Sequence, residues 1–227
     1  MGRPELPLFS PMSPDAFAPF DGLGGLCALA RDAQFRLVWC NEEYARQIGE
    51  TRESLIGSSP GNHLPVGLAT ERITHMRRVL ETGRMVAFYQ VWNGARWHTR
   101  IWPLDPKAFG KEGCFIVMSR ALEPEPEEGE ARAAVLAPAV DLGDLAVLTK
   151  RELEVYYYLA SGLTTAQIAD TLYRSPKTIG RHIGSIHAKM GYTKRSDVVR
   201  DATKRGLIAF SPDEWMRLVD PPKSSST

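Results

Sequence analysis

The sequence predicts an α+β domain followed by an all-α domain of four helices, with an acidic linker between them. An Asn-Gly pair at positions 93 and 94 lies between two apolar runs, which favours a β-hairpin. Residues 145–208 instead contain four stretches with helical periodicity and helix-capping residues. The formal charge is −6 over residues 121–144 and +6 over residues 145–208, although the 227-residue chain carries only +1.

These shifts in pattern and charge divide the chain into five segments. The acidic segment has seven carboxylates and one arginine among Pro, Glu and Ala residues, a composition typical of an extended linker. The basic segment has eleven Lys and Arg residues against five Asp and Glu. We expect a flexible N-terminal arm at 1–21, the α+β domain at 22–120, the linker at 121–144, the four-helix domain at 145–208 and a C-terminal tail at 209–227.

Composition excludes several classes of protein. No apolar run approaches the roughly 18 residues that span a membrane, and the proline-rich N-terminus lacks the apolar core of a secretory signal. Cys27, Cys40 and Cys114 lie in apolar, strand-like sequence, which is typical of reduced and buried thiols. Metal-ligand spacing, nucleophile–base pairs and phosphate-binding loops are absent from the sequence. We therefore expect a cytoplasmic protein that is not an enzyme and has no membrane partner.

The α+β domain begins with the stretch GLCALARDAQFRLVWCN, which predicts two strands around a turn at Asp32-Ala33. Asn41 then caps a short helix, and a longer helix over residues 67–82 ends at Gly83. Three further strands follow, and the Asn-Gly turn joins the first two. This order of strands, helices and strands predicts an antiparallel sheet with helices on it.

The four-helix domain begins at Thr149, which forms a capping box with Glu152. Thr164 or Thr165 starts a short second helix, and Ser175 caps the third. A turn of a few residues joins the second and third helices, so together they form a helix-turn-helix. The fourth helix covers residues 196–205 and ends at Gly206.

The third helix has two different faces. Ile179, Ile183, Ile186 and Met190 are three or four residues apart and form one buried stripe. The opposite face has little bulk and two positive charges; it consists of Lys177, Gly180, Arg181, Gly184 and Ala188. Each glycine inside a helix costs about 1 kcal/mol relative to alanine. A helix that enters a DNA groove would benefit from this face, but a solvated face or a helix-packing notch is also consistent with it.

The motifs in this domain resemble the LuxR-type (GerE, NarL/FixJ-like) DNA-binding domain. The resemblance covers about 60 residues and rests on Leu-Thr-x-Arg-Glu-x-Glu-Val, Ala-x-Gly-Leu-Thr, Gln-Ile-Ala-x-x-Leu, Ser-x-x-Thr-Ile and Lys-Met-Gly. It implies a four-helix fold whose third helix reads the major groove. The family usually has a DNA-contacting Lys where this chain has Gly180, which leaves more of the readout to Arg181. The implied DNA-contacting residues are Lys177, Thr178, Gly180, Arg181, Gly184, Lys189 and Lys194, whereas Glu154 would be a structural pairing residue.

The first domain resembles the PAS fold over about 100 residues. The stretch RLVWCNEEYARQIGETRESLIG is similar to that fold's strand, Asn-started helix, glycine and following turn. PAS domains act as ligand-sensing cups, as dimerisation modules, or as both. The sequence requires no cofactor and leaves a small molecule, haem or flavin open. His75 is a haem candidate, and its alternative is a surface or hydrogen-bonded histidine.

Aromatic residues gather in the last three strands of this domain. They could line a pocket for an apolar ligand, but core packing or a dimer face accounts for them equally well. The candidate pocket residues are Phe88, Trp92, Trp97, Trp102 and Phe115.

We therefore read the sequence as a DNA-binding transcription regulator in which a PAS-like input domain controls a LuxR-type helix-turn-helix. The expected partners are double-stranded DNA and a second copy of the chain, with RNA polymerase left open. The alternatives are a haem- or flavin-containing redox sensor and a protein-interaction adaptor that uses the C-terminal helices. The linker glutamates either keep a spacer solvated or shield the cations of the helical domain; they are Glu123, Glu125, Glu127, Glu128 and Glu130.

Overall fold

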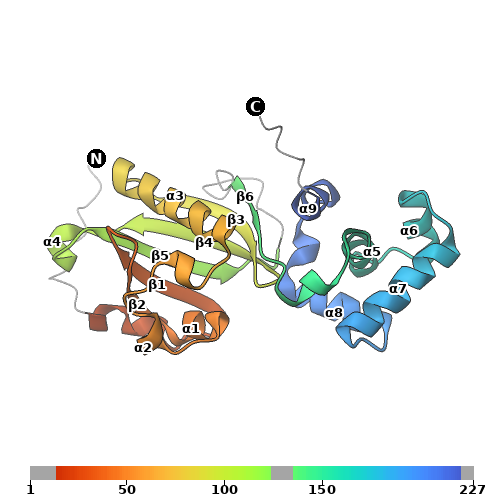
Figure 1. Cartoon of the computed structure of the whole chain (residues 1–227), viewed down its shortest axis with the longest axis horizontal. Helices are drawn as coiled ribbons and strands as arrows, with labels where there is room; N and C mark the ends of the chain where they lie inside the picture. The colour runs from red at the N-terminus through yellow and green to blue at the C-terminus, as the bar shows by residue number, and fades with distance from the viewer. Residues whose placement is uncertain (1–13, 124–134, 221–227) are drawn as a thin grey trace, which may run out of the picture. The chain divides into compact units, whose positions relative to one another are not determined.

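The computed structural model describes residues 14–123 and 135–220 (Figure 1). The chain forms two compact units. The first comprises residues 1–88 and 99–119, and the second comprises residues 89–98 and 120–227. The division falls inside two neighbouring strands, so the tip of one β-hairpin belongs to the second unit.

The sheet has six strands in the order β2-β1-β5-β4-β3-β6. Strand β1 pairs antiparallel with β2 and with β5, and its Leu29 lies opposite Cys40 on one side and Ile116 on the other. This arrangement confirms the predicted α+β class. The strands are β1 (Leu26–Asp32), β2 (Leu37–Cys40), β3 (Val86–Trp92), β4 (Ala95–Pro103), β5 (Gly113–Arg120) and β6 (Val135–Val140).

Helices connect the strands of the first unit, and its predicted caps are confirmed. Asn41 caps the first helix and is fully buried; its amide oxygen accepts the N–H groups of Ala28 and Tyr44. Gly83 ends the long helix in the left-handed region, as expected of a helix C-terminus. The helices are η1 (Pro14–Phe20), α1 (Glu42–Ile48), α2 (Arg52–Leu55), η2 (Pro60–Asn62), α3 (Val66–Thr82) and α4 (Pro106–Phe109).

Alternation along the strands gives this part of the sheet two buried faces. Leu29 and Ile116 line a small hollow together with Tyr44 of α1 and Met76 of α3. Ala28 and Ala30 point the other way, and their cluster includes Phe17 of η1. The sheet is thus covered by α1 and α3 on one face and by η1 on the other.

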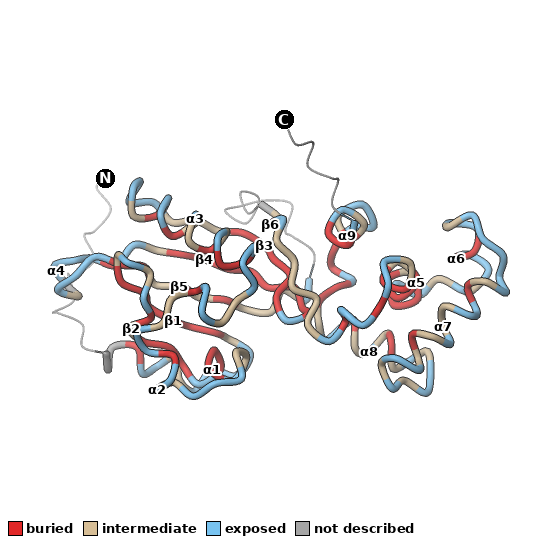
Figure 2. The backbone as a smooth tube through the Cα atoms, viewed as in Figure 1, coloured by how far each residue is buried: buried red, intermediate tan, exposed pale blue. Residues whose placement is uncertain are grey.

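The second unit contains the helical domain. Its central helix is α5, which is buried along most of its length (Figure 2). The predicted capping box of Thr149 with Glu152 is present. Of the two predicted starts of the second helix, Thr164 is its N-cap, and it forms a capping box with Gln167 that was not predicted from the sequence. The elements are η4 (Gly143–Val147), α5 (Lys150–Ala160), α6 (Thr165–Thr171), α7 (Pro176–Met190), α8 (Arg195–Arg205), η5 (Leu207–Ala209) and α9 (Pro212–Val219).

The flanking segments are more ordered than the sequence indicates. Part of the expected linker forms β6 and η4, and Leu145 is fully buried in the helical core. The expected tail contains α9, whose Trp215 is fully buried and donates its indole N–H to the carbonyl of Leu153. The expected arm contains η1, which buries Phe17. Apolar side chains in these short segments find partners that local composition does not reveal.

Some expectations fall on residues outside the described ranges. These are most of the N-terminal arm, the end of the C-terminal tail, and Glu125, Glu127, Glu128 and Glu130 of the linker. Within the described ranges, no helix is long and apolar enough to cross a bilayer. In the same ranges, no group of three or more His, Cys, Asp or Glu side chains is placed to hold a metal ion.

Candidate nucleic-acid interface

The helix-turn-helix consists of α6, a short turn and α7. Ser175 caps α7, and its hydroxyl accepts the backbone N–H of Thr178 at 3.2 Å. Pro176 occupies the first turn, where its missing N–H would have had no helical partner. The turn itself contains Tyr173, which has a positive φ of 52° and is 89% exposed. The sequence therefore fixes the start of α7 sharply.

The two faces of α7 are as the sequence predicts. Ile179 and Ile186 are fully buried, and Ile183 and Met190 pack against the same core while partly exposed. The opposite face is open to solvent, and its exposed residues are Lys177, Gly180, Arg181, Gly184, Ala188 and Lys189. The helix is thus held on one side and free on the other.

The two glycines of α7 have no packing reason in the described part of the chain. A Cβ added at Gly180 or at Gly184 would meet no heavy atom within 4 Å. Both residues also have ordinary helical backbone angles, so neither needs a left-handed conformation. A packing notch within the described chain therefore does not account for them.

Few cations of the helical domain are free to meet an anion. Arg151 pairs with Glu154, and Arg200 pairs with Asp197. Arg195 donates to main-chain carbonyls at Leu159 and Leu163. Among the described residues, the cationic groups without an ion pair or hydrogen bond include those of Lys177, Arg181, Lys194 and Lys204. Two of these four, Lys177 and Arg181, are on the open face of α7.

Glu152 connects α5 to α7. Its carboxylate is buried and accepts hydrogen bonds from Ser185 at 2.5 Å, from Lys189 at 2.6 Å and from the backbone of Thr149 at 2.7 Å. Burial alone would raise the pKa of Glu152, but the hydrogen bonds from Lys189, Ser185 and Thr149 outweigh it and hold the pKa at about 2. The carboxylate is therefore charged at neutral pH and fixes α7 on α5.

This contact bears on one of the predicted DNA-contacting residues. The Lys189 ammonium, although one-third exposed, is bound to Glu152. A phosphate contact of Lys189 stays a prediction, and such a contact would have to share this ammonium with the carboxylate. The sequence identifies Glu152 as a capping residue only, because its partners Ser185 and Lys189 lie more than thirty residues away.

The five aromatic residues predicted to line a pocket lie in separate ring contacts. Phe88 stacks on His75 with ring centroids 4.2 Å apart. Trp92 pairs with Trp97, whose indole N–H bonds the Trp92 carbonyl. Trp102 lies near Phe115, with ring centroids 6.5 Å apart. These contacts favour core packing over a shared cavity.

Two hollows in the first unit are lined by other residues. The larger has a volume of about 150 Å³ and lies on the face of the sheet that η1 covers, between Phe17, Trp39, Leu104 and Phe109. The smaller, of about 20 Å³, lies between the sheet and α3 and holds at most one water molecule. The larger hollow could not be found from sequence, because Phe17 lies in a segment without strand or helix periodicity.

The haem candidate and the cysteines occupy buried surroundings. Burial lowers the pKa of His75, and nearby Arg72 and Arg78 lower it further, so its imidazole is neutral. The three cysteines are buried free thiols, as predicted. Burial raises the pKa of Cys40 to about 11 and that of Cys114 to about 12, which makes both thiols unreactive at neutral pH.

Comparison with protein families confirms both resemblances. Residues 146–202 match the model of bacterial regulatory proteins, luxR family, and residues 20–120 match a PAS fold. Over 64 residues the chain is 34% identical to the transcriptional regulatory protein DegU of Brevibacillus brevis and 36% identical to the oxygen regulatory protein NreC of Staphylococcus aureus. These matches cover 28% of this chain and 27% and 30% of those proteins, so the chain spans less than a third of either relative.

Two solved structures align with most of the chain. The VqmA–ligand–DNA complex of Vibrio cholerae has 20% sequence identity and a TM-score of 0.47, covering 91% of this chain and 93% of that one. The Vibrio cholerae VqmA dimer without target DNA has 21% identity, a TM-score of 0.45 and the same coverage of both chains. The family matches carry the assignment: this chain has a PAS fold at residues 20–120 and a helix-turn-helix domain of the luxR family of bacterial regulatory proteins at residues 146–202.

Proposed function

We propose that the protein is a transcription regulator that binds double-stranded DNA with the open face of α7, and that its PAS domain supplies the input. One observation carries the proposal. The helix that follows the turn has one face packed on the core, while its other face combines two cations that have no partner among the described residues with glycines that border open space. A recognition helix needs free cations for phosphates and base edges, and little bulk where its backbone nears the bases.

An adaptor that binds another protein through these helices is the competing function. An exposed protein-binding face would normally present large apolar or aromatic side chains. The exposed residues of α7 include none, apart from the ring of Pro176 at its start. The open face therefore favours an anionic, groove-shaped partner. Steep salt dependence of duplex binding supports this reading, whereas absence of duplex binding at low salt would favour the adaptor.

We predict that Arg181 reads a base. Its guanidinium lies on the open face between two glycines, and arginine commonly contacts the edge of guanine in the major groove. Arg181→Ala should cost about 1–3 kcal/mol of binding free energy and relax specificity at one position of the site. Selection from random duplexes tests this, with Arg200→Ala on α8 as a control of equal charge change. An unchanged motif for the Arg181 variant would refute the assignment.

We predict that Lys177 contacts a phosphate rather than a base, as we also propose for Lys194. Lys177 lies in the first turn of α7 and is unpaired among the described residues. Lys177→Gln should weaken binding to all sequences alike and reduce the magnitude of the salt slope by about 1. Lys150→Gln is the control, because Lys150 is already paired with Asp220. Equal slopes for the Lys177 variant and the wild-type protein would contradict the prediction.

We propose that the DNA-bound form is a homodimer on an inverted repeat. One domain of this size buries too little DNA surface for tight specific binding, and two-fold dimers bind paired half-sites. Sedimentation of the complex on its best duplex should give two chains for each duplex. A complex of one chain with one duplex at saturating affinity is the result that this proposal does not allow.

The input to the PAS domain is proposed only as a class. The hollow of about 150 Å³ is mostly apolar, although Arg31 and Lys111 also line it, and it is large enough for one small organic molecule but not for a flavin or a haem. We therefore propose a regulator without a tightly bound redox cofactor. An absorbance spectrum of the purified protein tests this directly, because a bound haem or flavin would show visible bands.

A further inference from the structure

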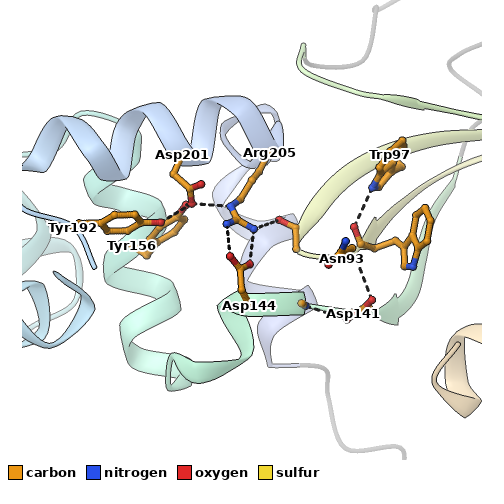
Figure 3. A network of polar contacts seen from close by, with 11 residues as sticks. Asn93, Trp97, Asp141, Asp144, Tyr156, Tyr192, Asp201 and Arg205 are labelled. Atoms are coloured by element: carbon orange, nitrogen blue, oxygen red, sulfur yellow. Dashed lines mark hydrogen bonds and ion pairs between the residues drawn. The ribbon is translucent and has the colours of Figure 1, made fainter. Parts of the chain in front are cut away.

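The Asn93-Gly94 turn joins β3 to β4 inside the residues that match the PAS fold, yet it belongs to the same compact unit as the DNA-binding helices. The turn is held by Asp141, which follows β6. The Asp141 carboxylate accepts the N–H groups of Asn93 and Gly143, each at 3.0 Å, and its main-chain carbonyl accepts the N–H of Gly94. These hydrogen bonds fix a PAS turn on the segment that leads into α5 (Figure 3).

Glycines make this contact close. A Cβ added at Gly94 would lie 2.6 Å from the Arg205 side chain and 2.7 Å from the carbonyl oxygen of Leu142. At Gly143 it would lie 2.8 Å from the side chain of Asn93. Both glycines also have positive φ angles. In contrast to Gly180 and Gly184 on α7, these two glycines are required because the backbones approach each other closely. We call the contact of the Asn93-Gly94 turn with Asp141, Gly143 and Arg205 the joint.

Arg205 is the centre of the joint. This residue ends α8, and its side chain is only 15% exposed. Two of its nitrogens bind the Asp144 carboxylate at 2.7 and 2.8 Å, and a third binds Asp201 at 2.7 Å. The carbonyl of Gly94 accepts a further, longer contact at 3.4 Å. The planar guanidinium reaches these acceptors together only in one position, so it links the turn to α8.

Asp201 extends the network to the end of α7. Its carboxylate accepts the hydroxyls of Tyr156 on α5 at 2.7 Å and Tyr192 at 2.6 Å. Tyr192 follows Gly191, the cap of α7. Its backbone N–H donates a hydrogen bond to the carbonyl of His187 in the last turn of that helix. Burial would raise the pKa of Asp201, but the hydrogen bonds from Arg205, Tyr192 and Tyr156 lower it, so a charged acceptor holds all three.

We propose that this joint couples the position of the Asn93-Gly94 turn to the end of the DNA-binding helix, with Arg205 as the coupling residue. The chain of hydrogen bonds runs from the turn through Arg205 and Asp201 to Tyr192, as Figure 3 shows. A movement of β3 and β4 that displaces the turn removes an acceptor from Arg205 and shifts the acceptor shared by Tyr156 and Tyr192. The coupling can exist whether or not the protein binds DNA, but its regulatory purpose rests on the proposed DNA-binding function.

Amide hydrogen exchange on the full-length protein tests the coupling. Gly94→Ala crowds the turn, and it should raise exchange at Gly191 and Tyr192 by about threefold or more, the size of coupling expected between contacting residues. In an Arg205→Gln background the same change should have no further effect on these two amides. In an Arg200→Gln background it should keep its full effect, because Arg200 lies on the same helix but pairs with Asp197.

A second variant guards against misfolding of the first. Asp141→Asn weakens the hold on the turn without adding bulk, and it should give the same pattern of exchange. The coupling is overturned if both turn variants leave Gly191 and Tyr192 unchanged, or if their effects are as large with Arg205→Gln as without it. Duplex affinities of the same variants separate the two proposals. Coupled exchange in a protein that binds no DNA would refute the proposed function and leave the joint standing.

Discussion

A Glu152→Gln variant is expected to lose about 2–4 kcal/mol of folding stability at pH 7, because it removes the charge that Lys189 and Ser185 face. The carboxylate is buried, and its three hydrogen bonds are all 2.7 Å or shorter. Glutamine has the same shape, so the loss would report on the charge rather than on packing. Urea unfolding followed by circular dichroism measures it.

The pH dependence of this effect has a definite sign. The pKa of Glu152 is about 2 in the folded protein, below its ordinary value of 4.5. A lowered carboxyl pKa contributes stability that is fully present above about pH 4.5 and is lost as the pH falls toward 2. The difference in stability between wild-type and Glu152→Gln proteins should therefore shrink over that interval. A constant difference from about pH 6 to about pH 3 would contradict it.

Glu154→Gln provides the matched control two residues away. Glu154 pairs with Arg151 three residues earlier on the same helix, and both side chains are partly exposed. Such pairs contribute about 0.5 kcal/mol or less. A loss for Glu154→Gln as large as that for Glu152→Gln would mean that general helix electrostatics, and not the link between α5 and α7, explains the result.

Glu152 also shows what the sequence can and cannot predict. Its capping box with Thr149 spans three residues, so local pattern is sufficient to find it. Its contacts with α7 depend on how two helices pack, and no local pattern encodes them. The same distinction separates the predicted caps at Ser175 and Gly206, which are confirmed, from the network around Arg205, which joins residues up to 111 positions apart.

Elements in low-complexity sequence are harder to predict than elements with strong periodicity. The stretch that forms β6 reads as linker because it contains Ala and Pro, yet Leu136 and Val140 pack against the helical core. The aromatic residues of β3 to β5 suggest one pocket, but they lie in separate ring contacts. Position along a strand sets the face of a side chain, whereas residue type alone does not.

Substitutions of the α7 glycines should change folding stability and DNA affinity in opposite directions. Gly184→Leu is expected to stabilise the fold by up to about 1 kcal/mol, because leucine is a far better helix former than glycine. The added side chain would meet no described atom at its Cβ and needs no change of backbone. The same variant is expected to lower DNA affinity by about tenfold or more, since the new bulk occupies the space between the helix and the base edges.

Gly180→Leu should behave in the same way, and alanine variants should keep the gain in stability with a smaller loss of affinity. Gly67 supplies the control, because it is an exposed glycine in the first turn of α3 and a Cβ there also meets nothing within 4 Å. Gly67→Leu should leave DNA affinity unchanged. Opposite signs for folding and binding at positions 180 and 184, but not at 67, mean that a partner outside the chain requires the glycines. Undiminished DNA affinity of Gly180→Leu and Gly184→Leu would show that this face of α7 does not enter the groove.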